Sequence, residues 1–354
     1  MKPLNILIIF GGCSGEYKVS LESVCGVLES LDREKYNPVT VGITRCGEWY
    51  YYFGSIEGIR NDCWFSSEYT MPAMISPDKT KRKLIVFGDR KTEAIQIDAA
   101  FPVLHGKNGE DGTVQGLIEL SGIPLIGCNT LSSALCMDKD KAHRLVSAYG
   151  INVPISAVLN KNAKEGEIAE AADGIGYPLY VKPVKAGSSL GITRVSSGDQ
   201  LTEAVKNALL YDSEIIFEEN IEGVETGCAV IGSGSRLTVG EPDEIMLENG
   251  FFNYLEKYTP KTSQVKCPSS FSDQTKEKIK NTARAIYNIL GCSGFARVDM
   301  FLTKTGKIYF NEVNTIPGFT SHSRFPAMLK ATGYTDTQIT DKVIQEALNK
   351  ESEN

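Results

Sequence analysis

The sequence has no apolar run long enough to cross a membrane and no block of like charges among its 354 residues. A membrane-spanning helix needs about 20 consecutive apolar residues, whereas the apolar run nearest the N-terminus covers only residues 5–10. Two glycines follow that run instead of a small-residue cleavage site, which argues against a signal peptide. The net charge of −7 gives no attraction to nucleic acid or to an anionic membrane surface. We therefore predict a cytoplasmic protein that binds neither.

Cysteine spacing typical of zinc sites is absent as well. None of the nine cysteines forms a C-x-x-C pair, and the three histidines give no Cys/His cluster of metal-binding spacing. An odd number of cysteines in a protein of this size suits reduced, mostly buried thiols in a cytosolic protein, and we interpret them as residues that fill the core. The 42% hydrophobic and 23% charged residues are ordinary for a globular chain, and the length allows two or three domains.

The dinucleotide-binding fingerprint is missing too. The loop of residues 11–16 follows the first apolar run, where such a turn would lie, but its glycines lack the G-x-G-x-x-G spacing. No acidic residue ends the next apolar run at 39–43, so a nicotinamide oxidoreductase is disfavoured. Glu16, near a helix start, would repel a pyrophosphate and suits a substrate ammonium instead.

What the sequence does contain is an alternation of short apolar runs with helical periodicity, which predicts an α/β fold. Runs at 6–10, 39–43 and 100–104 predict buried strands, and residues 19–31 predict a helix. The aromatic-rich stretch 46–97 between them is predicted to be an irregular elaboration of the first domain.

Later segments continue the alternation. Asp138 is a typical helix N-cap, and Gly150 is a typical helix end. Residues 178–182 and 215–218 predict two strands that could flank one sheet. The domains that we predict are 1–127, 128–219 and 220–354.

Two alternating segments near the C-terminus, 295–302 and 308–314, are separated by a Thr-Gly pair and predict a β-hairpin. Side chains two residues apart share a strand face, and the polar side chains on this face are Arg297, Asp299, Glu312 and Asn314. If the strands pair, the two carboxylates lie about 5 Å apart, and a cation between them would relieve their repulsion. Hard oxygen ligands favour Mg²⁺. An exposed salt-bridged hairpin explains this segment equally well.

A second group of residues suits phosphate binding. The strand that ends at Lys182 leads into a glycine- and serine-rich loop, 183–191, whose N–H groups and hydroxyls can bind phosphate. The loop contains no Walker A pattern. Lys139, directly after the predicted N-cap, is a further candidate cation. An ordinary surface turn accounts for the loop equally well, and Lys139 taken alone is more often a solvated helix residue than a ligand.

Two further segments have candidate ligands. The strand end at 218–221 can bind adenine through its backbone, and Glu225 can bind a ribose, although an ordinary charged strand end is the alternative. His105, in the glycine-rich loop 105–113, can contact a substrate carboxylate, although a lone histidine is more often structural. We interpret His143, within a helix, as structural.

Taken in chain order, the motifs resemble the D-alanine–D-alanine ligase family of ATP-grasp enzymes over nearly the whole sequence. The motifs are Gly11-Gly12-x-Ser14-x-Glu16-x-x-Val19-Ser20, His105-Gly106-x-x-Gly109-Glu110-Asp111-Gly112-Thr113, Lys182-Pro183 with Gly187-Ser188-Ser189-x-Gly191, Glu256-Lys257-Tyr258, Gly294-x-x-Arg297-x-Asp299, and Asn311-Glu312-Val313-Asn314-Thr315-x-Pro317-Gly318-x-Thr320. No single motif decides, but this many in this order is very specific. Within the family the chain resembles the vancomycin-resistance ligases of VanG type, which make D-alanyl-D-serine.

The resemblance implies three domains, with ATP bound between the central and C-terminal domains. It implies that the carboxylate of a first D-alanine takes the γ-phosphoryl group of ATP, and that the amine of a second amino acid then attacks the acyl phosphate and releases phosphate. It also implies a homodimer and two Mg²⁺ ions, or Mn²⁺ in their place, bound by Asp299, Glu312 and Asn314.

The resemblance assigns roles to the remaining residues. Those that would bind ATP are Lys139, Lys182, Ser188, Ser189, Glu218, Glu219, Ile221, Glu225 and Lys257. Glu16 would take the first ammonium, and Ser188 and Tyr258 would tie a mobile lid, about residues 248–266, closed over it.

Arg297 and the Gly318 N–H would face the oxyanion of the tetrahedral intermediate, and Ser323 would take the second carboxylate. The residues that would contact the substrates are Val19, Ser20, His105, Phe252, Ser323 and Arg324.

The second substrate depends on a few residues. The pattern Glu256-Lys257-Tyr258 is typical of members that form dipeptides, so we expect an amine as the nucleophile. Arg324 offers five donors on a rigid fork that can grip a serine hydroxyl, and Phe252 would narrow the same subsite. We therefore expect D-alanine and D-serine as substrates, in peptidoglycan precursor synthesis and vancomycin resistance. The alternative function is a housekeeping ligase of two D-alanines, and the alternative for Arg324 is a side chain that points to solvent and only tunes the local charge.

Overall fold

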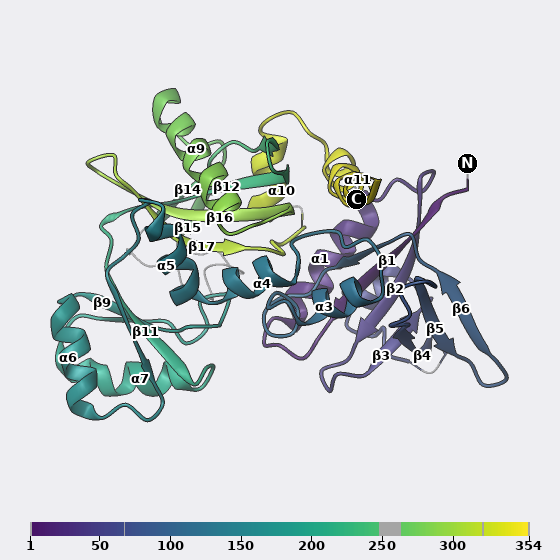
Figure 1. The fold of residues 1–354 in the computed structure, drawn as a ribbon, viewed down its shortest axis with the longest axis horizontal. Helices are drawn as coiled ribbons and strands as arrows, with labels where there is room; N and C mark the ends of the chain where they lie inside the picture. The colour runs from purple at the N-terminus through teal and green to yellow at the C-terminus, as the bar shows by residue number, and fades with distance from the viewer. Residues whose placement is uncertain (1, 67, 248–262, 321, 353–354) are drawn as a thin grey trace.

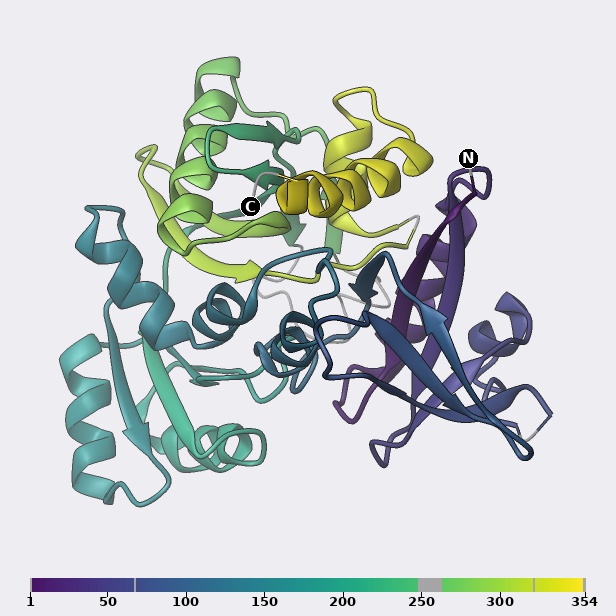
Figure 2. The same ribbon diagram turned by 45° about the vertical axis from the view of Figure 1, so that its right-hand side comes forward.

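The computed structural model contains three β-sheets with helices packed against them (Figure 1). The residues that it describes are 2–66, 68–247, 263–320 and 322–352. Each sheet belongs to a separate lobe, and two short helices, α4 (Thr130–Met137) and α5 (Lys139–Ala148), lie between the lobes (Figures 1 and 2). In the described part of the chain no helix is long and apolar enough to span a membrane. The α/β prediction is confirmed.

The first sheet has seven strands in the order β6-β5-β4-β3-β2-β1-β7. β1 pairs in parallel with β2 and β7, and residues 6–10 are fully buried because a parallel strand is covered on both faces. The elements of this parallel part are β1 (Leu4–Gly11), α1 (Tyr17–Ser30), β2 (Tyr36–Ile43), β7 (Ala99–Pro102) and α3 (Thr113–Leu120). The predicted strands and the predicted helix of this part are confirmed.

The prediction that residues 46–97 are irregular is wrong. They form four antiparallel strands that extend the first sheet beyond β2. The elements are β3 (Trp49–Tyr52), α2 (Ile56–Arg60), β4 (Thr70–Ile75), β5 (Lys83–Phe87) and β6 (Thr92–Gln96). The alternation was hard to recognise because β3 has aromatic side chains on both faces, and because β6 at the sheet edge is mostly exposed.

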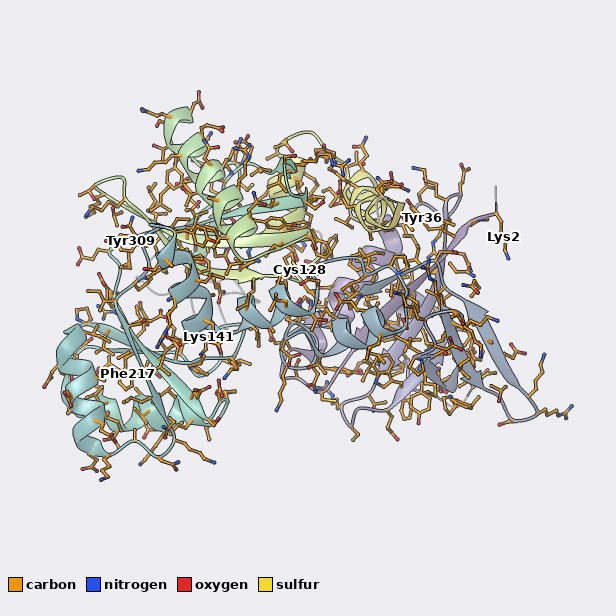
Figure 3. All side chains as sticks on the ribbon, viewed as in Figure 1. Lys2, Tyr36, Cys128, Lys141, Phe217 and Tyr309 are labelled. Atoms are coloured by element: carbon orange, nitrogen blue, oxygen red, sulfur yellow. The ribbon has the colours of Figure 1, made fainter. Side chains whose placement is uncertain are left out.

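The second sheet has four antiparallel strands in the order β10-β9-β11-β8. Its elements are β8 (Ser156–Asn160), α6 (Glu165–Ile175), β9 (Leu179–Pro183), β10 (Thr193–Val195), the 3₁₀ turn η1 (Gly198–Gln200), α7 (Leu201–Leu209) and β11 (Glu214–Glu219). β9 and β11 belong to one sheet, as predicted, and are neighbours in it. Phe217 of β11, labelled in Figure 3, is buried in the core that α6 and α7 cover.

The third sheet has six strands, in the order β15-β14-β12-β16-β17 with β13 beside β12. Its elements are β12 (Gly223–Ser233), β13 (Arg236–Val239), β14 (Glu244–Leu247), β15 (Ser263–Lys266), α9 (Asp273–Ile289), β16 (Gly294–Thr303), β17 (Ile308–Asn314), α10 (Arg324–Lys330) and α11 (Asp336–Ser352). β16 and β17 form the predicted hairpin, and Gly306 in its turn has a φ of +76°, which glycine adopts readily.

The first and third sheets share a core. Phe101 of β7 contacts Phe295 of β16 and Phe319, with ring centroids 5.7 and 5.6 Å apart, and all three rings are buried. This shared core holds the first sheet close to β16 and β17, the strands that carry Asp299 and Glu312.

The start of α5 is fixed by its cap. Asp138 accepts a hydrogen bond from the backbone N–H of Lys141 at 3.0 Å, and Lys141 is labelled left of centre in Figure 3. The helix ends at Ala148 with Tyr149 as its C-cap, and Gly150, directly after the cap, has a left-handed φ of +81°. Both predicted helix ends are confirmed. Because α5 packs against β17, its first residue, Lys139, lies close to the hairpin.

All nine cysteines are free thiols. Five of them are buried, but Cys13, Cys46 and Cys63 are exposed, so the prediction of core thiols is wrong for these three. They lie in loops that follow β1, β2 and α2, where no second layer covers the side chain.

Candidate active site

The β16–β17 hairpin brings the predicted metal-binding side chains together. Asp299 and Glu312 are cross-strand partners, as predicted, and Arg297 lies opposite Asn314. Arg297 donates three hydrogen bonds of 2.6–3.1 Å to the Asp299 carboxylate, and Asn314 Nδ2 donates to it at 3.0 Å. Lys139 Nζ lies 3.8 Å from Glu312. The charges of the two buried or half-buried carboxylates are thus compensated by neighbouring cations.

The donor set of the hairpin fits Mg²⁺. Two carboxylates and a side-chain amide share one face of paired strands, and hard oxygen donors are what this ion prefers. Among the described residues there is no cluster of three or more Cys, His, Asp or Glu side chains that could hold a metal. Mg²⁺ at this hairpin would therefore need substrate phosphate oxygens or water to complete its octahedron, as it usually does.

Two buried ammonium groups lie near the hairpin. Lys182 on β9 forms an ion pair with Glu218 on the neighbouring strand β11, and Lys139 Nζ donates to the backbone oxygen of Ala186 at 2.6 Å. Burial alone would raise the pKa of Glu218, but the neighbouring side chains, Lys182 above all with His143 and Lys139, together outweigh burial, and the pKa lies below its ordinary value. Positive charge is thus concentrated between the loop 183–191 and the carboxylates.

Three glycine-rich loops meet at the Glu16 carboxylate. Ser188 Oγ donates a hydrogen bond to it. A Cβ on Gly106 would lie 2.4 Å from Glu16 Oε2, and one on Gly187 would lie 3.0 Å from it, so both loops can approach the carboxylate only because they have glycine there. Ser188 and Ser189 have φ values of 51° and 56°, a region that side chains rarely adopt and that is common at functional loops.

Ser20 and His105 belong to the framework of these loops. The Ser20 hydroxyl accepts from the Gly11 N–H at 2.8 Å and donates to the Val103 carbonyl, and the side chain is fully buried. His105 Nε2 lies 3.1 Å from the Ser23 hydroxyl. Burial lowers the pKa of His105 to about 4, so the ring is neutral at pH 7.

Glu110 is a site residue to which the sequence motifs gave no role. It accepts hydrogen bonds from the backbone N–H groups of Gly106 at 2.8 Å and Ile316 at 3.3 Å, and so joins the first lobe to the segment after β17. Burial, and the nearby Glu16 carboxylate, raise the pKa of Glu110 to about 8. Glu110 therefore carries a proton at neutral pH.

The raised pKa of Glu110 predicts a pH dependence of stability. The native protein binds one more proton than the unfolded chain between pH 4.5 and about 8, so the free energy of unfolding falls as pH rises through that window. Glu110→Gln mimics the protonated acid. We therefore expect the decrease in the free energy of unfolding across this pH window to be smaller in the variant, by on the order of a few kcal/mol. Thermal melts of both proteins from pH 5 to 8.5 measure it, and parallel curves would contradict the assignment.

Ser323 and Gly318 lie together at the end of the third sheet. Ser323 Oγ accepts from the Thr320 N–H at 3.0 Å and lies 2.7 Å from the Thr320 hydroxyl. A Cβ on Gly318 would lie 2.7 Å from Ser323 Oγ. The close approach again requires glycine, and it keeps the Gly318 backbone and the Ser323 hydroxyl within reach of one small substrate.

Arg324 is buried, so the alternative in which it points to solvent is wrong. Its Nε and one terminal nitrogen bond to both oxygens of Asp243 at 2.6 and 3.0 Å, the other terminal nitrogen lies 3.2 Å from Glu225, and Asp299 is 3.5 Å away. Asp243, fully buried between β13 and β14, was missed because it lies in a short connection without periodicity and meets Arg324 only through the tertiary fold.

The other predicted residues divide into two groups. Glu219 on β11 accepts from the Ile155 N–H at 2.9 Å, while Val19 and Ile221 are partly exposed. Most of the predicted lid, 248–266, lies outside the described residues. This part includes Phe252, Lys257 and Tyr258, whose roles stay predictions.

Comparison with known families decides the relationship. The family descriptions "D-ala D-ala ligase N-terminus" and "D-ala D-ala ligase C-terminus" match residues 5–128 and 145–345. The chain belongs to the D-alanine–D-alanine ligase family. It is therefore a ligase that forms a peptide bond from small amino acid substrates, with the ATP-grasp fold of a family that depends on ATP and typically uses Mg²⁺.

Individual relatives are similar over nearly their whole length. The chain is 42% identical to a D-alanine–D-alanine ligase of Caldicellulosiruptor bescii, covering 99% of this chain and 96% of that protein. It is 41% identical to the vancomycin/teicoplanin A-type resistance protein VanA of Enterococcus faecium, covering 98% and 99%. Among solved structures, the VanG D-Ala:D-Ser ligase of Enterococcus faecalis is 49% identical with a TM-score of 0.90, covering 98% of this chain and 100% of that chain.

Proposed function

We propose that this ligase joins D-alanine to D-serine through D-alanyl phosphate, with ATP as the phosphoryl donor, for cell-wall precursors that confer vancomycin resistance. The observation that carries the choice of D-serine is the buried Arg324. Three of its five N–H donors bond to carboxylates of described residues, which fixes the guanidinium beside Asp299 and leaves donors for a hydroxyl. The VanG relative supports the same choice.

The residues divide the first step between them. Glu16, held by Ser188 Oγ, binds the ammonium of D-alanine, and Lys139 and Lys182 neutralise the ATP phosphates as they approach. Two Mg²⁺ ions at Asp299, Glu312 and Asn314 would supply charge neutralisation for phosphoryl transfer. Because Lys182 lies on the second sheet and the hairpin belongs to the third, ATP would lie between these two sheets.

The second step takes place where the third sheet meets the first lobe. Arg297 and the Gly318 N–H stabilise the oxyanion that forms when the amine attacks the acyl phosphate. Ser323 binds the carboxylate of the incoming amino acid, and Arg324 beside it donates a hydrogen bond to the hydroxyl of the D-serine side chain. A pocket built around a hydroxyl leaves polar groups unpaired when D-alanine enters, which costs about 1–3 kcal/mol.

Adenosine recognition completes the proposal. Glu218 and Glu219 at the end of β11, with Ile221, bind adenine, and Glu225 at the start of β12 binds the ribose.

We also propose domain boundaries near residues 127 and 220, which fall between the three sheets.

A housekeeping D-alanine–D-alanine ligase is the second candidate, since the relative from C. bescii bears that name. A competition assay separates the two: D-alanine at a fixed concentration, ATP, and D-serine at equal concentration, with the dipeptides resolved by mass spectrometry. D-alanyl-D-serine should exceed D-alanyl-D-alanine. A product that is mainly D-alanyl-D-alanine would contradict the D-serine assignment and leave the ligase assignment intact.

A further inference from the structure

His143 lies one helical turn after Lys139 on α5 and is almost fully buried. Its Nε2 is 2.8 Å from the backbone oxygen of Asn311, and its ring packs edge-on against Phe310 with centroids 5.3 Å apart. A carbonyl oxygen can only accept, so Nε2 carries a proton and donates to it. In the uncharged tautomer that has its proton on Nε2, the other ring nitrogen, Nδ1, is an acceptor.

His143 Nδ1 faces a second acceptor. It lies 3.9 Å from Glu218 Oε1, and among the described residues neither atom has a hydrogen-bond partner. Lys182 occupies the other oxygen, Oε2, of the same carboxylate. Two acceptors that face one another in a buried site are unfavourable unless a donor group forms a hydrogen bond to each of them.

We propose that His143 is a nucleobase-positioning residue that shares the exocyclic amino group of adenine with Glu218. An amino group has two N–H donors, and the two acceptors can take one each. A 6-oxopurine would place an oxygen against both acceptors and be rejected. The inference rests on the proposed function, which puts ATP at Glu218, and it replaces our purely structural interpretation of His143.

Two substitutions distinguish the contribution of Nδ1 from that of Nε2. His143→Gln places an amide N–H near the position of Nε2, so it keeps the bond to Asn311 and removes the acceptor that faces Glu218. His143→Asn places its amide near Nδ1, so it keeps an acceptor toward Glu218 and loses the bond to Asn311. Both variants are compared with the wild-type full-length chain by calorimetric titration with ADP and with IDP, and by thermal melts.

We expect wild-type protein to bind ADP more tightly than IDP, and His143→Gln to reduce that ratio at least fivefold. His143→Asn should keep most of the ratio even where its melting temperature falls. A loss of ADP and IDP affinity in equal proportion in His143→Gln would show a structural role only and overturn the proposal.

If the wild-type protein binds IDP as tightly as ADP, this result alone overturns the proposal. Binding of ADP with an unchanged ratio in His143→Gln, in a protein that still makes dipeptide, would refute the role of His143 and leave the proposed function standing. Failure of the wild type to bind either nucleotide would refute both.

Discussion

Asp299→Asn and Glu312→Gln are each expected to leave a folded protein whose ligase turnover is lower by about 10³-fold or more, since a metal contribution of several kcal/mol is lost from the transition state. The two carboxylates are cross-strand partners in the hairpin. Each substitution keeps the shape of the side chain and removes one negative charge from the proposed Mg²⁺ site. ATP consumption with D-alanine, followed by coupled ADP detection, measures the loss.

The control must separate catalysis from folding, because Asp299 also pairs with Arg297 and its removal leaves a buried cation without its partner. Melting temperature and circular dichroism of each variant show whether the fold persists. Glu277→Gln, at an exposed ion pair with Arg284 on α9, is the matched control and should keep full activity. Near-normal turnover in a folded Asp299→Asn or Glu312→Gln protein would exclude the metal assignment.

Removal of the Arg324–Asp243 pair should change the choice of second substrate. We expect the preference for D-serine over D-alanine, as a ratio of kcat/KM values, to fall about tenfold or more, which corresponds to about 1.4 kcal/mol. The physical reason is the loss of the buried donors that can bond to a serine hydroxyl. Steady-state kinetics with each second substrate at saturating ATP and D-alanine measure the ratio.

The single substitution Arg324→Leu is a poor test by itself. It leaves Asp243 buried without its cation, and breaking such a pair costs about 3–5 kcal/mol of stability. The double variant Arg324→Leu/Asp243→Leu removes both charges, so it should be more stable than the single variant and equally unselective. An unchanged D-serine preference in a folded double variant would contradict the role of Arg324.

Local patterns predicted much of this fold. Residue alternation at 295–302 and 308–314, with Gly306 between them, was enough to place Asp299 beside Glu312, because a two-residue period and a turn fix which side chains share a face. Capping chemistry located both ends of α5. The loops around Glu16 were each visible in the sequence, although only the structure shows that Gly106 and Gly187 bring them together.

What the sequence did not predict depends on contacts between distant segments. Asp243 and Arg324 are separated by 81 positions and meet only because β12, β14 and α10 pack together. Glu110 was visible in a motif, but its raised pKa arises from burial and from the approach of Glu16 across the fold. His143 appeared structural because nothing near it in the sequence indicates that its second nitrogen faces Glu218.

The central claim is ligation through an acyl phosphate, and isotope transfer tests it most directly. D-alanine carrying ¹⁸O in both carboxylate oxygens is incubated with the enzyme, Mg²⁺, ATP and unlabelled D-serine, and the released phosphate is analysed by mass spectrometry. If the carboxylate takes the γ-phosphoryl group before the amine attacks, each phosphate carries one ¹⁸O and the dipeptide keeps the other at its amide carbonyl. Unlabelled phosphate released together with dipeptide would contradict the mechanism.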